Sequence, residues 1–582
     1  MSEFNLLDEG WISVVTDYKG TTKLVGMKEF FKDAHKYIAL AGDTKTQDFA
    51  VMRFLLAVLH TVFSRYDADG VVYKGIELDD RMRQVEEIKG RAAKEYPDAL
   101  MKTWKDLWNS GKFPEIVDEY LEAWRDRFYL FDDKYPFYQV TKDFFESCTL
   151  VNQKSETKSP GWISFKTINR KISETKDKDA IFSMVSDVDS ELKGDLDSAQ
   201  LTRWLINYMA YSSTPDKTKI KSYLDIKEIE KYDGHKGWQY AIGAIHYNDI
   251  NLFRTLLLNL VLVHPLEKFI VKIQKPAWEL TPEENVRFYL EKRSVDNLAK
   301  LYTDYSRAVN VSNDKNKYGK YFTIAQLPIL DKKNNFLECM TIWQKVKLKG
   351  VKEKVWIAKE NQVHESLWRN FGIIYLANIT DWSDYRAPGI IDWFRKISKN
   401  ISDKSYIKLS SLGIKSDGTA SNVMLNEIND ELYIRLSVSE DLASNGWISR
   451  INNIIESTKL FLEENYRNFA TVIVMLCTGT DKPKKEDVDS LLEQVYFKVD
   501  KPFKDWLASI DYNEDKEKKL IECKKIIIDI IREEAKQAYL KLGDRAFIGI
   551  NYQSNKNKEY TNIAMTYNKL AIELTKYEKG DL

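Results

Sequence analysis

The six histidines are the natural candidates for metal or acid–base chemistry, because imidazole ligates metals and titrates near neutral pH. They are scattered along the chain, and no two have metal-ligand spacing on one helical face. His60 lies in an apolar helical stretch, which favours a satisfied core histidine. The sequence contains no G-x-x-x-x-G-K-[ST] loop, no G-x-S-x-G elbow and no H-E-x-x-H motif. We therefore expect no catalytic residues, no metal and no cofactor.

One acidic pattern resembles the start of a calcium-binding loop. Asp187, Asp189 and Glu191 alternate as such a loop requires, but Leu192 occupies the sixth position, where the loop needs Gly. The pattern therefore indicates a solvated acidic turn. A pair of catalytic carboxylates needs no sequence motif, so a cryptic hydrolase stays open as an alternative function.

The cysteines argue against a disulfide framework and against a cysteine-based zinc site. There are four of them, and no two are close enough in sequence to form a C-x-x-C pair. Reduced thiols are the expected state, as in intracellular proteins. The residues are Cys148, Cys339, Cys477 and Cys523.

Positive charge is concentrated in two stretches. Residues 154–178 hold seven Lys or Arg against three acidic residues, and residues 313–355 hold ten Lys against four acidic residues. Both stretches contain aromatic residues, among them Trp162, Phe165 and Tyr321. Lysines beside a phosphate backbone give affinity without sequence information, and aromatic rings stack on bases. The two stretches are therefore candidates for nucleic-acid contact.

The charge of the whole chain is balanced, with 88 Lys plus Arg and 88 Asp plus Glu. Free proteins that coat DNA are strongly basic, so a DNA contact here requires local charge segregation or a site shared with other subunits. The length of 582 residues predicts several domains.

Nothing in the sequence predicts a membrane or secretory protein. The N-terminus lacks a basic-then-apolar signal pattern. The most apolar stretches, 253–263 and 469–477, are too short to cross a bilayer. We expect a cytoplasmic protein with no membrane partner.

The elements that position these residues follow from hydrophobic periodicity. Residues 10–15 and 22–25 predict a β-hairpin, and Thr44 and Gln47 predict a capping box before a helix. Residues 150–225 form long polar loops, and β-type segments dominate between 300 and 360. Near the C-terminus, four amphipathic stripes begin near 448, 488, 521 and 563, the third ending at Gly543 as a C-cap.

These elements predict an α+β protein. A large mixed domain over residues 1–438 precedes a C-terminal four-helix bundle over residues 439–582.

Four segments carry short motifs in a fixed order. They are F-N-L-L-D-E-G-W-I-S-V at 4–14, F-Y-L-F-D with Y-P-F-Y-Q-V at 128–140, Y-T-D-Y-S-R at 302–307, and Y-R-A-P-G-I-I at 385–391. The ordered set resembles the CasA family, the large subunits of type I-E CRISPR Cascade complexes. The resemblance covers nearly the whole chain.

The resemblance implies a non-catalytic subunit of a crRNA-guided antiviral complex. Such a subunit recognises the short PAM in double-stranded DNA, helps to open the duplex and recruits a helicase-nuclease. Its partners are the target DNA, the crRNA-containing Cascade subunits and that helicase-nuclease.

The resemblance also implies three DNA-reading loops and a strand-separating wedge. The first loop falls within 171–187, since Ala180–Ser183 resembles its core, although Leu150–Gln153 is a rival placement. The second loop stands where the family has a glycine-rich loop. In this chain its serine and threonine hydroxyls could bond phosphates instead. The third sends a lysine into the minor groove, and the wedge offers an apolar group for insertion between base pairs. The nucleic-acid-binding residues expected are Phe182, Ser183 and Met184; Ser212, Ser213, Thr214, Lys217 and Lys219; Lys317 and Lys320; and Pro388, Gly389 and Ile390.

A second reading of the same sequence is a pure scaffold. Such a subunit would tether other proteins through its bundle and aromatic surfaces without touching DNA. Crosslinking of the assembled complex to a PAM-containing duplex distinguishes the two functions.

Overall fold

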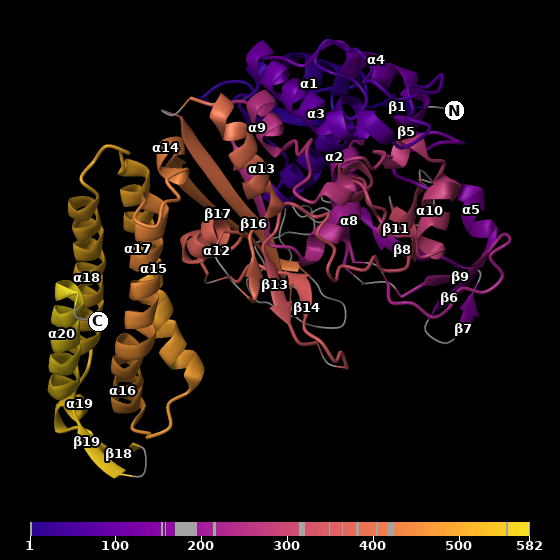
Figure 1. Ribbon diagram of the computed structural model, residues 1–582. Helices are drawn as coiled ribbons and strands as arrows, with labels where there is room; N and C mark the ends of the chain where they lie inside the picture. The colour runs from indigo at the N-terminus through magenta and orange to yellow at the C-terminus, as the bar shows by residue number, and fades with distance from the viewer. Residues whose placement is uncertain are drawn as a thin grey trace. The chain divides into compact units, whose positions relative to one another are not determined.

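The computed structural model (Figure 1) describes most of the 582-residue chain. The described residues are 3–152, 155–157, 159–168, 195–213, 217–234, 236–312, 321–348, 350–363, 365–379, 383–402, 405–416, 424–554 and 557–580. They fall into two compact units. The first unit contains Met1–Asn361, Ser383–Asn400 and Ser410–Asn429, and the second contains Gln362–Trp382, Ile401–Leu409 and Asp430–Leu582. The sequence predicts a division at residue 438 into a DNA-recognition domain and a helical bundle. That division into functional domains stays a prediction.

Helix α2, Lys45–Phe63, forms the centre of the first unit. Thr44 caps it by accepting a hydrogen bond from the Gln47 amide, as the sequence predicted, but the Gln47 side chain accepts from Asp43 instead of closing a capping box. Among the described helices, α2 is the one long and apolar enough to cross a membrane, with a mean hydropathy of 1.2. Of that apolar window, 94% is buried inside the structure, as befits a core helix.

Two of the motif segments pair near the N-terminus. Strand β1, Glu3–Asn5, lies antiparallel to β5, Tyr129–Phe131, and the Leu6 amide donates to the Phe128 oxygen at 2.8 Å. The predicted hairpin is confirmed as β2, Ile12–Val15, and β3, Thr22–Val25, with β4, Ala39–Leu40, on the other side of β2.

A mixed six-stranded sheet positions most of the predicted DNA-reading segments. Its strand order is β11-β12-β9-β6-β7, and β8 also pairs with β12. All its described pairings are antiparallel except that of β12 with β9. The strands are β6 Cys148–Asn152, β7 Ser155–Thr157, β8 Gly161–Ser164, β9 Lys219–Tyr223, β11 Arg307–Ser312 and β12 Tyr321–Gln326. The stretch predicted as polar loops therefore contributes four strands.

Two three-stranded sheets and further helices complete this part of the chain. The sheets have the orders β10-β16-β17 and β14-β13-β15. Their strands are β10 Ala244–Asn248, β13 Trp343–Val346, β14 Val355–Ala358, β15 Tyr385–Arg386, β16 Tyr406–Ser416 and β17 Met424–Arg435. The helices are α1 Met27–Asp33, α3 Gly90–Ser110, α4 Ile116–Ala123, α5 Lys142–Glu146, α6 Phe165–Ile168, α8 Ser198–Tyr211, α9 Leu252–Asn259, α10 Pro282–Leu290, α11 Leu298–Tyr302 and α13 Gly389–Ile397.

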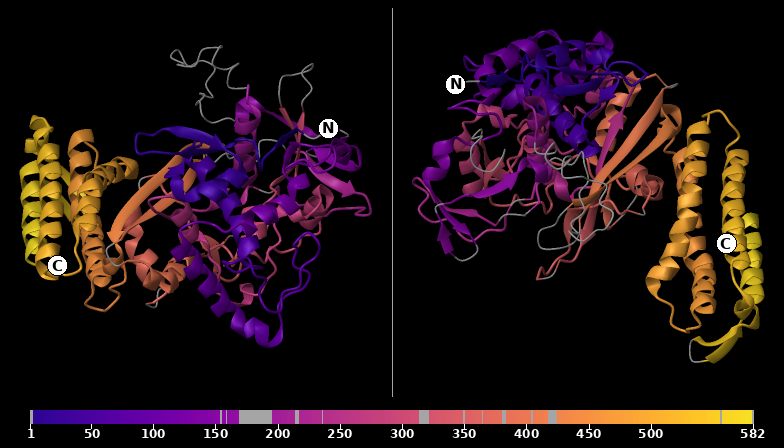
Figure 2. Two further views of the ribbon diagram at one scale, coloured as in Figure 1. Left: turned by 90° about the horizontal axis from the view of Figure 1, so that it is seen from above. Right: turned by 180° about the vertical axis from the view of Figure 1, so that it is seen from behind.

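The second unit confirms the predicted C-terminal helical region, whose long helices run side by side in both views of Figure 2. Helix α15, Trp447–Phe461, continues through a π-helical turn, Leu462–Tyr466, into α16, Arg467–Thr478. The other long helices are α17 Lys485–Ser509, α18 Lys516–Leu540 and α20 Ile563–Lys579, and the short ones are α12 Phe371–Leu376, α14 Leu436–Ser439 and α19 Asp544–Ile548.

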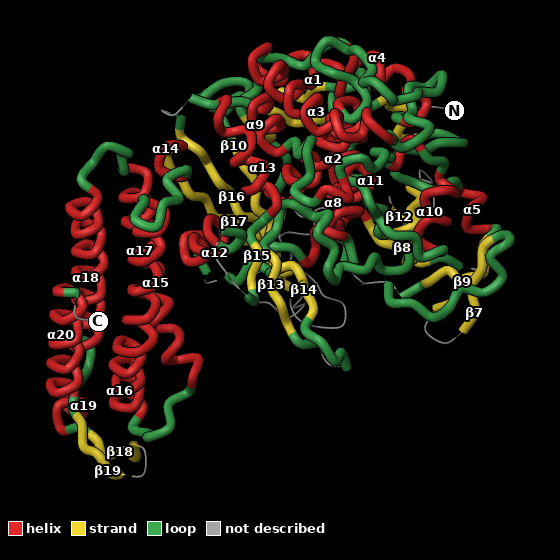
Figure 3. Tube along the Cα trace, viewed as in Figure 1, coloured by secondary structure: helices red, strands yellow, loops and turns green. Residues whose placement is uncertain are grey.

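The connection between α18 and α20 differs from the prediction. Gly543 is not the C-cap of α18, which ends at Leu540; it precedes α19 in an extended conformation, with φ of −81°. A hairpin of β18, Ile550–Ser554, and β19, Asn557–Thr561, follows (Figure 3). The sequence prediction missed this hairpin because strands this short carry little periodicity.

Candidate nucleic-acid interface

Several predicted contact residues lie outside the described part of the chain. They are Phe182, Ser183 and Met184 of the first loop, Thr214 of the second, and Lys317 and Lys320 of the third. The residues on either side of these segments are described, so the two ends of each segment are known.

The flanks of the first and third loops meet at one end of β12. In the sheet register, Tyr321 of β12 pairs with Ser164 of β8 on one side and with Ser312 of β11 on the other. The chain passes from β8 through α6 toward 169–194, and from β11 toward 313–320. The sheet thus brings together the origins of two segments that lie about 150 residues apart in sequence.

An aromatic pair, one ring exposed and the other half-buried, marks this end of the sheet. Trp162 of β8 is 63% exposed, and its ring lies edge-on to that of Tyr321, with centroids 6.5 Å apart. Pairing of Trp162 with Thr323 places both rings on the same face of the sheet. Phe165, which the sequence grouped with them, is 1% exposed and packs on Phe322, so it belongs to the core.

The second loop begins as an anchored segment. Ser212 is 1% exposed, and its hydroxyl donates to the Ser306 hydroxyl at 2.8 Å. The Gly237 amide donates to the Ser212 main-chain oxygen at 3.1 Å, and the Arg307 guanidinium donates to the Ser213 main-chain oxygen. The Ser212 hydroxyl is therefore committed inside the protein, against the expectation that it bonds a phosphate. The anchors Ser306 and Arg307 belong to the Y-T-D-Y-S-R motif, which was the signal that could have identified them.

The two lysines after this loop differ in their surroundings. Lys217 is exposed, whereas the Lys219 ammonium donates to the Tyr232 main-chain oxygen and lies 5.3 Å from the Tyr232 ring centroid. Lys219 pairs with Gln326, at the opposite end of β12 from Tyr321. Five residue steps of about 3.3 Å separate these two ends by roughly 17 Å.

The predicted wedge lies at the buried beginning of α13. Ile390 is fully buried, and its amide donates to the Cys339 main-chain oxygen at 2.9 Å. Pro388 is buried too, and a Cβ on Gly389 would meet Cys339 Sγ at 3.1 Å. Insertion of Ile390 between base pairs does not fit this arrangement, because its side chain already fills the core.

The lysine-rich stretch 313–355 contains both structural and exposed lysines. Lys332 donates to the main-chain oxygens of Gly237 and Trp238, and burial lowers its pKa to about 8. Lys354 forms a 2.9 Å ion pair with Asp384. The count of ten lysines in the stretch 313–355 therefore overstates how many cations are available to a phosphate backbone.

One cysteine–histidine pair resembles a catalytic dyad but is electrostatically inert. Cys339 Sγ lies 3.2 Å from His264 Nε2. Burial raises the pKa of the Cys339 thiol well above its usual value and lowers the pKa of His264 to about 4. Burial thus favours the neutral form of both groups near pH 7 and opposes the thiolate that nucleophilic catalysis requires. Among the described residues, no cluster of three His, Cys, Asp or Glu side chains could hold a metal ion.

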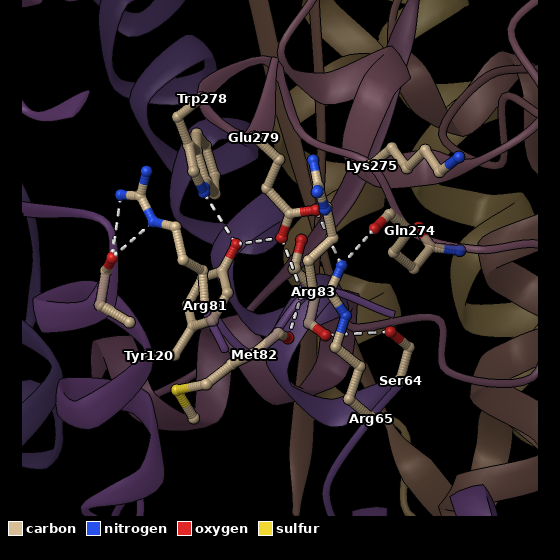
Figure 4. A network of polar contacts seen from close by, with 12 residues as sticks. Ser64, Arg65, Arg81, Met82, Arg83, Tyr120, Gln274, Lys275, Trp278 and Glu279 are labelled. Carbon is tan, nitrogen blue, oxygen red and sulfur yellow. Dashed lines mark hydrogen bonds and ion pairs between the residues drawn. The ribbon is translucent and has the colours of Figure 1, made fainter. Parts of the chain in front are cut away.

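A buried polar network around Arg65 is structural (Figure 4). Its guanidinium makes bonds of 2.7 and 3.0 Å to the Glu279 carboxylate, and it also donates to the Met82 and Gln274 main-chain oxygens. The Tyr120 hydroxyl donates to Glu279 at 2.7 Å. Arg65 and Glu279 are at most 1% exposed along their side chains, so this charge pair is compensated internally and sealed from ligands.

Known proteins that are similar to this chain in sequence or in fold all carry CRISPR-associated names or titles. A curated CRISPR-associated protein CasA/Cse1 from Thermus thermophilus is 28% identical over 141 residues, 24% of this chain and 21% of that relative. The fold is similar to Thermobifida fusca Cse1, with a TM-score of 0.70 and 22% identity over 99% of this chain and 98% of that one. It is also similar to a chain of a structure titled CRISPR RNA-guided surveillance complex, with a TM-score of 0.60 and 12% identity over 99% and 100%.

The aligned stretch thus spans about a fifth of the curated relative, whereas the structural matches cover almost the entire chains. The family model described as CRISPR-associated protein Cse1 matches residues 5–540. Since that range is most of the 582 residues, the chain belongs to the CRISPR-associated protein Cse1 family.

Proposed function

We propose that this protein is the non-catalytic large subunit of a crRNA-guided type I-E CRISPR surveillance complex in the cytoplasm. It recognises the PAM in double-stranded DNA, helps to open the duplex and recruits the helicase-nuclease. The observation that carries the proposal is the family match over residues 5–540. In this proposal, residues 1–438 recognise DNA and residues 439–582 form the bundle that meets protein partners.

The end of the sheet at Tyr321 supports a DNA-facing role. Two lysine-bearing segments start there, and the exposed Trp162 ring and the half-buried Tyr321 ring lie beside them. Cations bind the phosphate backbone, while exposed rings stack on unpaired bases of any sequence. The combination suits a subunit that grips a short duplex flank and stabilises bases as they unpair.

The neutral Cys339–His264 pair supports a role without catalysis. The DNA cleavage that follows target recognition then belongs to the recruited helicase-nuclease.

A pure scaffold is the second candidate function, and the burial of Ser212 and Ile390 favours it. Two of the expected DNA contacts are unavailable in this structure. A scaffold would hold other subunits together without reading the PAM.

Assembly of the complex with and without this subunit tests the proposal. Gel shifts with a guide-matched duplex, with and without a PAM, measure the contribution of the subunit to target binding. We expect PAM-dependent binding only in the complete complex, and weaker binding when both Lys317 and Lys320 are replaced by Ala. Equal target binding by the complex lacking this chain overturns the proposal. Loss of assembly, with no crosslink between this chain and the PAM duplex, establishes the scaffold instead.

A further inference from the structure

Two facing residues of the six-stranded sheet hold the base of the second predicted DNA-reading loop. Arg307 of β11 pairs with Gln326 of β12 in the sheet register. The chain leaves the core at Ser213, which bonds Arg307, and returns at Thr218, which bonds Gln326. Residues 214–217 lie between these two points in the sequence. Both ends of the loop are therefore attached to adjacent strands.

The returning end is held chiefly through the main chain. The Gln326 amide donates to the Thr218 main-chain oxygen at 2.8 Å, and Lys219 pairs with Gln326 in the parallel ladder. The Tyr232 hydroxyl accepts from the Ile220 amide and donates to the Gln326 main-chain oxygen, each at 2.9 Å. These bonds fix the place at which the chain re-enters the sheet.

The departing end is held by a buried arginine side chain. Arg307 is fully buried, and its Nη1 donates to the Ser306 main-chain oxygen at 2.6 Å, while its Nη2 donates to the Ser213 main-chain oxygen. Hydrogen bonds from a charged donor are about twice as strong as those between neutral groups. The planar guanidinium bridges two oxygens at fixed positions, which the compact ammonium of a lysine does not reproduce.

A close backbone approach completes the departing end. The Gly237 amide donates to the Ser212 main-chain oxygen at 3.1 Å, and a Cβ on Gly237 would meet the Ala210 main-chain oxygen at 2.2 Å. Glycine therefore lets this segment lie against the end of α8. The Gly237 bond is one residue before the oxygen that Arg307 holds, so its strength reports whether the departing end stays in place.

One lysine at this base is left for a ligand. The Lys219 ammonium donates to the Tyr232 main-chain oxygen, and Lys221 forms a 2.6 Å ion pair with Glu156. Lys217 is exposed and forms no ion pair with a residue that the structure describes. Fixing a contact segment before binding reduces the entropy that is lost when the complex forms.

We propose that Arg307 is a positioning residue for DNA binding, which holds the Ser213 end of the loop so that Lys217 meets a backbone phosphate of the target duplex. This inference rests on the proposed function and adds a residue that does not itself touch DNA. Without the arginine, the segment up to Lys217 is firmly attached only at its returning end, and ordering it on DNA costs more conformational entropy.

A cycle of double variants in the assembled complex tests the proposal. Lys217→Ala is compared in the parent chain, in Arg307→Lys and in Arg65→Lys, by gel shifts of a guide-matched PAM duplex over a salt series. Arg307→Lys keeps the charge but loses the bridge between two oxygens. Arg65→Lys is the matched control, because Arg65 is equally buried and holds the main-chain oxygens of Met82 and Gln274, which lie outside the loop.

We expect Lys217→Ala to reduce the slope of log affinity against log salt by about 1 in the parent and in Arg65→Lys. Arg307→Lys alone should show the same reduction, and adding Lys217→Ala to it should change nothing further. An equal effect of Lys217→Ala in all three backgrounds overturns the role of Arg307 and leaves the proposed function standing. No effect in any background also overturns it, because the loop then has no contact to position. Target binding that is unchanged without this subunit overturns the proposed function, and this inference with it.

Hydrogen exchange of the full chain is a second measurement, which does not require assembly of the complex. Mass spectrometry of peptides that cover Gly237 and Gln326 follows amides bonded to the two ends of the loop. Arg307→Lys should speed exchange at Gly237 about tenfold and leave Gln326 unchanged. Unchanged exchange at Gly237 overturns the proposal, and so does equal acceleration at both amides, which marks a loss of stability throughout the unit.

Discussion

The hydroxyl of Ser212 donates a 2.8 Å hydrogen bond to the hydroxyl of Ser306, 94 residues further along the chain. This bond ties the end of α8 to the beginning of β11. Together with the Arg307 contact to Ser213, it fixes the direction in which the second predicted DNA-reading loop leaves the core. The Ser212 hydroxyl itself is therefore occupied inside the protein.

Replacing Ser212 by Ala should lower the free energy of unfolding by about 1 kcal/mol, because a buried hydrogen bond is lost. Urea unfolding measures this change. The double variant with Ser306→Ala should be close to the single variant, since both hydroxyls belong to one bond. Unchanged stability combined with weakened DNA binding by the complex would instead return Ser212 to the role of a phosphate contact.

Lys217→Ala should weaken target binding by the complex more than Lys219→Ala. Lys217 is exposed and ready for a phosphate, while Lys219 is held by Tyr232. Loss of one phosphate contact reduces the slope of log affinity against log salt by about 1. Gel shifts over a salt series measure the slope for each variant. Equal slopes for Lys217→Ala and the unmodified complex contradict a phosphate contact at this position.

Trp162→Ala should weaken binding of an unpaired strand without destabilising the fold. The ring is 63% exposed, so little core packing is lost, whereas stacking of one base on an aromatic ring contributes about 1–3 kcal/mol. Fluorescence of 2-aminopurine placed in the target duplex reports base unstacking in the assembled complex. Trp162→Phe serves as the control and should retain most of the effect. A normal signal from Trp162→Ala removes this ring from the interface.

The elements predicted correctly are those encoded by local pattern. The hairpin of β2 and β3 follows from its turn signal, helices α15, α17, α18 and α20 follow from amphipathic stripes, and Thr44 caps α2 through its own neighbour. The fold class follows from these elements, because each one reveals the face that it must bury.

The errors concern residues whose role is set by distant partners. Ile390 follows Pro-Gly and so resembles a turn tip, but Cys339 and the rest of the core cover it. Ser212 is polar and follows a helix, yet Ser306 buries its hydroxyl. In both cases the neighbouring sequence predicts an exposed loop, and only the tertiary packing shows otherwise.

Ile390→Ala should destabilise the protein by about 2–5 kcal/mol, because it leaves a cavity in the core at the start of α13. Ile390→Val is the matched control, with an expected cost of about 0.5–1.5 kcal/mol. Thermal unfolding measures stability, and permanganate footprinting of the complex measures duplex opening. Defects in duplex opening that grow in proportion to the loss of stability support a structural role of Ile390 in the core. An opening defect in a variant of normal stability supports the strand-separating role predicted from the sequence.

Acidification should destabilise the first unit well before its surface carboxylates are protonated. Burial lowers the pKa of His60 to about 3 and that of His264 to about 4, whereas an unfolded histidine titrates near 6.5. Below about pH 6.5 the unfolded chain therefore binds protons that the folded chain does not, and the free energy of unfolding falls as pH falls. Each histidine contributes a slope of up to about 1.4 kcal/mol per pH unit.

Asp48 opposes this trend, because burial raises its pKa to about 6 and the folded state takes up its proton first. Two histidines against one aspartate leave a net slope of about 1.4 kcal/mol per pH unit between roughly pH 6 and 4.5. Urea unfolding across this range measures the slope. His60→Gln should flatten it even if the variant is less stable at every pH, because one titrating group is removed. A slope that stays the same in His60→Gln shows that this histidine is charged, or solvated, in the folded protein.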